Sequence, residues 1–158
     1  LPDFPVVIKA LKKYQDPQQW LDGFWNNESS RTKDDFTTLN ILSMAAHYSP
    51  NSENKGLSID LPFDLATGNF KKNVWSKWKQ YDPINLVSDF VEQLKRMDLI
   101  YLDCGTSDEF NLQIGTKVFS EKCKSLGIKH EYEEYNGGHF NTNHRYDTSL
   151  KKIYKALE

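Results

Sequence analysis

The chain has 158 residues, a formal net charge of −2 and 27% charged residues, which suits one domain or part of a larger one. Its lysines and arginines are scattered rather than gathered into a basic stripe, so we expect no nucleic-acid partner. The sequence has neither the roughly 20 apolar residues of a membrane helix nor a signal-peptide pattern, so we expect no membrane partner. The compartment stays open, with the cytoplasm favoured.

Apolar spacing in the first half of the chain is mainly helical. It predicts helices over residues 6–14, 17–23, 34–48 and 72–79, with a polar loop over residues 26–33. Asp16 before Pro17 is typical of a helix start, and Gly23 is placed to end that helix. Residues 56–63 alternate and predict an extended, partly exposed segment, at most a sheet edge because Pro62 cannot donate a hydrogen bond.

The second half predicts an alternation of helices and strands. Asp82 and Pro83 repeat the helix-start pattern. The elements that follow are a strand over 99–102, a helix over 112–126 ended by Gly127, a strand over 129–135 and a last helix from about 148. Because parallel neighbours need a crossover such as a helix, this order predicts an α/β fold with few parallel strands.

The two cysteines, Cys104 and Cys123, are interpreted as small buried hydrophobic residues. Their spacing fits neither a disulfide framework nor a zinc site. A thiol or metal enzyme has too few candidate ligands in this sequence, so we expect no metal and no cofactor.

The chemically informative residues follow the two strands. Asp108 comes after the first strand, and His139 comes after the second, behind Gly137 and Gly138, which allow a tight loop. In a parallel sheet both loops lie at the carboxyl-terminal edge, so Asp108 and His139 are expected to meet there. An acid and a histidine in this chain order match the last two members of a Ser–Asp–His triad.

Each candidate also has a structural interpretation. Asp108 is placed to cap the helix that follows it, and a single histidine such as His139 is often a surface residue. We expect Glu109 to point elsewhere and Asp103 to satisfy a neighbouring turn. The remaining histidines are interpreted as surface or packing residues: His47, His130 and His144.

The segments that carry these residues are DPINLV, LIYLDCGTSDEF, GIKHEYEEYNGGH and HRYDTSLKKIYKAL. They resemble the esterase branch of the α/β-hydrolases that is related to enterochelin esterase and S-formylglutathione hydrolase. The resemblance implies the C-terminal strand–helix–strand–helix of that fold over residues 74–158 and a helical insertion and packing region over residues 1–73. It implies that Asp108 is the triad acid, that His139 is the general base, and that the substrate is a small ester or acyl compound.

The chain departs from that family at the nucleophile. The family places its serine in G-x-S-x-G on a strained turn, and this sequence contains no such motif. Ser43 has Ile41 where a glycine is needed, and Ser49 before Pro50 fits no better. We therefore expect a C-terminal fragment of a serine esterase that is inactive alone; the start at Leu1 rather than Met and the 13% aromatic content agree with a fragment.

One alternative stays open, namely a non-catalytic α/β module that binds a carbohydrate or a protein through Trp20, Phe24 and Trp25. A sheet cut out of a larger fold also has an unpaired edge. We therefore expect a homo-oligomer that associates through this edge or through the Trp and Phe surface.

Overall fold

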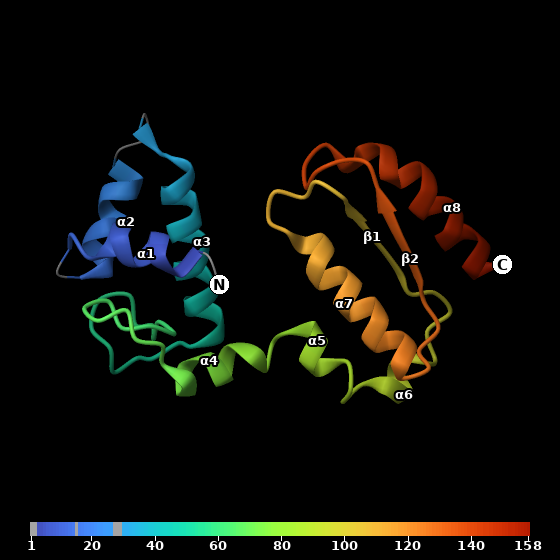
Figure 1. The fold of residues 1–158 in the computed structure, drawn as a ribbon, viewed down its shortest axis with the longest axis horizontal. Helices are drawn as coiled ribbons and strands as arrows, with labels where there is room; N and C mark the ends of the chain where they lie inside the picture. The colour runs from blue at the N-terminus through green and yellow to red at the C-terminus, as the bar shows by residue number, and fades with distance from the viewer. Residues whose placement is uncertain (1–2, 15, 27–29) are drawn as a thin grey trace. The chain divides into compact units, whose positions relative to one another are not determined.

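The computed structural model describes residues 3–14, 16–26 and 30–158, and the chain forms two compact units, Leu1–Tyr81 and Asp82–Glu158 (Figure 1). Each unit has its own buried core. Among the described residues, no helix has the length and apolar character needed to span a membrane.

The first unit is helical. Its helices are α1 (Asp3–Leu11), α2 (Pro17–Asn26), α3 (Lys33–Tyr48) and α4 (Lys72–Lys79). As predicted, Asp16 caps the start of α2: its carboxylate accepts a hydrogen bond from the N–H of Gln18 at 2.9 Å. Thr32 begins α3 and exchanges hydrogen bonds with Asp35 in a capping box.

Two predictions in this unit are wrong in detail. The first helix begins at Asp3 and ends at Leu11, and α2 continues past Gly23 to Asn26. The segment over 56–63 is partly exposed, as predicted, and its pairing is limited to isolated bridges at Ile59 and Phe63. Its side chains Ile59, Leu61 and Phe63 are buried in the core. The predicted loop over 26–33 falls partly on residues 27–29, which lie outside the described residues.

The core of the first unit contains several of its large aromatic rings. The buried apolar residues are Phe4, Val7, Leu11, Trp20, Phe24, Ile41, Leu42, Ala45, Ile59, Leu61, Phe63, Val74 and Trp78. Of the three aromatic residues considered for a binding surface, Trp20 and Phe24 are therefore core residues, whereas Trp25 is 57% exposed.

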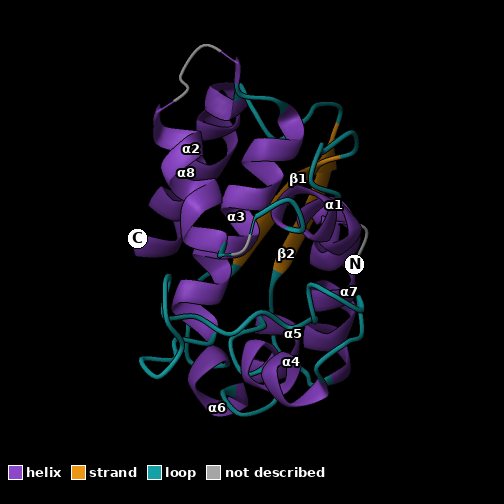
Figure 2. Ribbon diagram, turned by 90° about the vertical axis from the view of Figure 1, so that its left-hand side faces the viewer, coloured by secondary structure: helices purple, strands orange, loops and turns teal. Residues whose placement is uncertain are grey.

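The second unit is a mixed α/β fold. Its elements are α5 (Pro83–Leu86), α6 (Val91–Leu94), β1 (Tyr101–Gly105), α7 (Leu112–Ser125), β2 (Glu131–Tyr135), the 3₁₀ helix η2 (Thr142–Arg145) and α8 (Tyr146–Leu157). Within the described residues the sheet has two strands, which pair in parallel from Tyr101↔Glu131 to Gly105↔Tyr135. The strands lie between α7 and α8 (Figure 1 and Figure 2).

The predicted order of the second unit is confirmed, and several boundaries shift. Gly127 ends α7 with φ +69°, a conformation that favours glycine. The first strand begins at Tyr101 rather than Leu99, because the apolar run starts before the first residue that pairs with β2. The chain after Asp82 forms two short helices, α5 and α6.

An ion-pair cluster fixes the segment after β2 to the sheet. The Arg145 guanidinium lies 2.8 Å from carboxylate oxygens of both Asp103 and Glu133, and Lys152 lies 2.9 Å from the other oxygen of Glu133. The Tyr101 hydroxyl lies 3.0 Å from each of the same two carboxylates. The cluster therefore joins β1, β2, η2 and α8.

We expect the ion-pair cluster to lose part of its stabilising effect in acid, because Glu133 becomes protonated there. Hydrogen bonds from Lys152 and then Arg145 lower the pKa of Glu133 to about 2, from an ordinary value of 4.5. Because the pKa of Glu133 is lower in the folded chain than in the unfolded chain, the ionised carboxylate stabilises the fold. This stabilisation is complete above pH 4.5 and is lost as the pH falls through about 2. In urea unfolding followed by the amide NMR signals of β1 and β2, Glu133→Gln should lower the midpoint at pH 6 and have no effect near pH 2. The control Glu92→Gln, at an exposed i,i+3 pair, should leave the midpoint unchanged at both values; equal effects at both pH values would contradict the assignment.

Candidate active site

The site forms where β1 and β2 end. Because the strands are parallel, the loops after Gly105 and after Tyr135 leave the sheet at the same edge. Backbone hydrogen bonds join the two loops: the N–H of Thr106 donates to the Tyr135 carbonyl at 2.9 Å, and the N–H of Ser107 donates to the Gly137 carbonyl at 2.9 Å. These bonds hold the two predicted site residues on adjacent, connected loops.

Asp108 and His139 are in contact. Nδ1 of His139 lies 3.1 Å from Oδ2 of Asp108. The carboxylate side chain is 3% exposed and the imidazole is 40% exposed. An ionised carboxylate can only accept, so the proton of this bond belongs to Nδ1, and the lone pair of the neutral ring lies on Nε2. We call this pair the Asp–His dyad.

The second carboxylate oxygen of Asp108 accepts hydrogen bonds from the backbone around the start of α7. Oδ1 accepts hydrogen bonds from the N–H groups of Phe110 at 2.8 Å and Leu112 at 3.3 Å. Burial alone would raise the pKa of Asp108, but these two bonds and the contact with His139 outweigh burial and lower it. Asp108 is therefore both the structural residue that fixes the turn before α7 and an ionised partner for His139.

The prediction for Glu109 is wrong. Instead of pointing elsewhere, its Oε2 accepts a hydrogen bond from the backbone N–H of His139 at 2.7 Å. This bond is the first cause that lowers the pKa of Glu109. Adjacent acidic residues thus hold the side chain and the main chain of the same histidine.

Two exposed aromatic rings lie beside the imidazole. The ring centroid of His139 is 4.8 Å from that of Phe110 and 5.2 Å from that of Phe140, both in edge-to-face arrangements. Phe110 and Phe140 are 55% and 62% exposed. The surroundings of His139 therefore combine two carboxylates with apolar surface.

The remaining candidates have structural roles. Asp103 pairs with Arg145 rather than with a turn. His130 is more than a surface residue, because its Nε2 lies 2.7 Å from the hydroxyl of Ser120, which is fully buried. His47 packs against the rings of Tyr48 and Tyr81, as a packing histidine should.

Neither serine considered as a nucleophile stands on a strand-to-helix turn. Ser43 is exposed in the middle of α3. Ser49 is buried at the end of α3; its hydroxyl donates to the Asp60 carbonyl at 2.6 Å and accepts from the indole N–H of Trp78 at 2.8 Å. Both serines belong to the first unit, and Ser49 is committed to its core.

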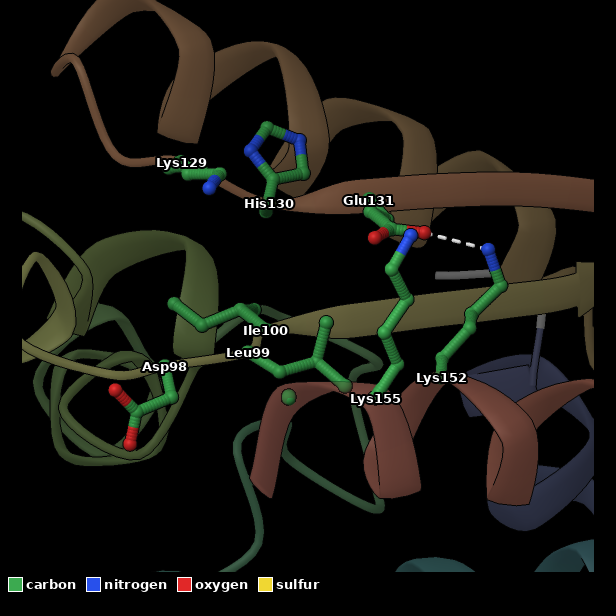
Figure 3. Close-up of a pocket in the computed structure, with 9 residues that line it drawn as sticks. Asp98, Leu99, Ile100, Lys129, His130, Glu131, Lys152 and Lys155 are labelled. Atoms are coloured by element: carbon green, nitrogen blue, oxygen red, sulfur yellow. Dashed lines mark hydrogen bonds and ion pairs between the residues drawn. The ribbon is translucent and has the colours of Figure 1, made fainter. Parts of the chain in front are cut away.

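A cavity of about 480 Å³ lies at the other edge of the sheet, around the residues that precede β1 and β2 (Figure 3). Its lining includes Asp98, Ile100, Lys129, His130 and Lys155. Asp108 and His139 do not line it, so the dyad is an open surface site rather than part of this cavity. Among the described residues, no group of three His, Cys, Asp or Glu side chains is placed to hold a metal ion.

The two loops approach so closely that glycine is required at Gly105. A Cβ added there would collide with the carbonyl oxygen of Gly137 and lie 2.7 Å from that of Gly138. Gly105→Ala should therefore separate the loops and destabilise the second unit by about 1–3 kcal/mol. The measurement is the urea midpoint of the β1 and β2 amide signals; Gly115→Ala on α7, where a Cβ meets nothing within 4 Å, is the control. A Gly105 variant as stable as the control would contradict the close approach.

Comparisons with known proteins add no relative. No family model matches the chain, and a search of curated proteins finds no significant match. Any functional proposal therefore depends on the geometry of the site.

Proposed function

We propose that this chain supplies the orienting acid and the general base of a serine-type ester hydrolase that acts on a small-molecule ester or acyl substrate. The observation that carries the proposal is the 3.1 Å contact between Asp108 and Nδ1 of His139 at the carboxyl edge of two parallel strands. The proposal includes the α/β-hydrolase fold, of which β1, α7, β2 and α8 would form the C-terminal part.

In this function each residue of the dyad has one role. A serine hydroxyl attacks the ester carbonyl and transfers its proton to Nε2 of His139, and the same proton moves to the alcohol oxygen as the acyl–oxygen bond breaks. His139 then takes a proton from a water that attacks the acyl-serine and returns it to the serine oxygen as the acid leaves. Asp108 keeps the proton-bearing Nδ1 directed at its carboxylate and stabilises the imidazolium as it forms. The proposal assigns the hydroxyl to a segment outside this sequence, since the sequence has no G-x-S-x-G motif and Ser43 and Ser49 occupy a helix and a buried core position.

The proposal is tested by comparing the isolated chain with the longer product of the same gene. An unactivated alkyl ester avoids the background reaction of free imidazole with activated esters. The isolated chain should not turn over this ester, whereas the longer product should hydrolyse it and carry a serine that a fluorophosphonate probe labels. Hydrolysis by the isolated chain that Ser43→Ala abolishes would contradict the proposal, as would a longer product without a labelled serine.

A further inference from the structure

The Glu109 carboxylate is hydrogen-bonded to the loop that carries His139. Its Oε2 accepts the backbone N–H of His139 at 2.7 Å, across a separation of 30 residues. Its carboxylate also lies against Gly138, where an added Cβ would be 2.7 Å from Oε1. The carboxylate thus contacts two consecutive residues of the loop.

We propose that Glu109 is a positioning residue, which fixes the main chain of His139 so that the imidazole stays on Asp108. This inference rests on the proposed function of the dyad. Three observations support it. The loop contains Gly137 and Gly138, residue types with wide backbone freedom, whose carbonyls accept bonds from Ser107 and Tyr135, whereas the N–H of His139 is held by Glu109. The imidazole is 40% exposed, so packing alone restrains it little. Asp108, in contrast, is fixed by the N–H groups of Phe110 and Leu112.

The charges around Glu109 make this contact dependent on pH. The titratable groups that face Glu109 are Asp108, its neighbour in the chain, and His139 on the opposite loop. The hydrogen bond from the His139 backbone lowers the pKa of Glu109 below 4.5 more than the charge of Asp108 raises it. The carboxylate is therefore ionised at neutral pH, and protonation in acid weakens its bond to the loop.

The test is ¹⁵N NMR of His139 in the intact chain, with the variants Glu109→Gln and Glu109→Ala. In the wild-type protein the His139 amide proton shift should follow the titration of Glu109 below pH 4.5. In Glu109→Ala this titration should vanish, and the ratio of Nδ1-protonated to Nε2-protonated ring should fall by about threefold or more at neutral pH. Glu109→Gln should be intermediate, because its side-chain carbonyl can still accept the amide proton.

Glu92→Ala is the matched control, since Glu92 is an exposed carboxylate of the same unit that does not contact the loop. It should leave both His139 signals unchanged. Wild-type amide and imidazole signals in Glu109→Ala would overturn the inference. The proposed function has a different failure, which is ester turnover that survives His139→Ala. That result would leave the expected amide and imidazole signals of His139 unchanged.

Discussion

Under the proposed function, in which a serine outside this sequence completes the triad, His139→Ala should lower kcat/KM by about 10⁴-fold or more. The variant removes Nε2, the atom that accepts the serine proton in the proposed mechanism. Asp108→Asn should cost about 10³- to 10⁴-fold, because an amide can donate to Nδ1 and so favour the ring tautomer whose Nε2 carries the proton. The measurement is steady-state hydrolysis of the alkyl ester at neutral pH.

His144→Ala is the control for this series. His144 is an exposed histidine in η2 whose Nδ1 lies 3.2 Å from the nearby Asn141 carbonyl and whose ring lies edge-on to Tyr135. Its loss should leave kcat/KM within about twofold of the wild-type value. Turnover of His139→Ala that matches this control would exclude His139 as the general base.

Trp78→Ala should destabilise the first unit by about 3–5 kcal/mol. The indole is 4% exposed and contacts the rings of Phe4, Tyr48 and Trp75. Its N–H also donates to the buried Ser49 hydroxyl at 2.8 Å. Truncation removes these contacts, leaves a cavity and deprives Ser49 of a donor. Because domains are stable by only about 5–15 kcal/mol, the loss is a large fraction of the total.

The measurement is urea unfolding followed by tryptophan fluorescence, which reports the first unit because all four tryptophans lie within it. Trp25→Ala is the matched control: this ring is 57% exposed, so its removal should cost less than about 1 kcal/mol. Equal midpoints for the two variants would contradict the core position of Trp78.

The arrangement of the dyad could be predicted from the sequence because its signals are local. The end of an apolar run, two glycines before His139 and the helical spacing between the strands are visible in single segments. The parallel pairing of Gly105 with Tyr135 then follows from the order of the elements. Gly23 shows where a local signal fails: Trp20 and Phe24 bury their rings from α2, which outweighs the roughly 1 kcal/mol that glycine costs inside a helix.

The contacts that hold the site together could not be predicted in the same way. Arg145 reaches Asp103 across 42 residues, and Glu109 reaches the His139 backbone across 30. Neither pair has a recurring spacing, since each depends on which loops the parallel sheet brings side by side. A charged residue directly after a proposed triad acid is the one sequence feature that could have indicated Glu109.

The hydrogen bond between Asp108 and His139 is tested most directly by the imidazole ¹⁵N spectrum of the neutral His139 ring. The predicted wild-type spectrum shows a proton mainly on Nδ1, and in Asp108→Ala the proton moves mainly to Nε2. A wild-type ring protonated mainly on Nε2, with the same spectrum in Asp108→Ala, would show that the acid does not orient the histidine and would contradict the proposed function.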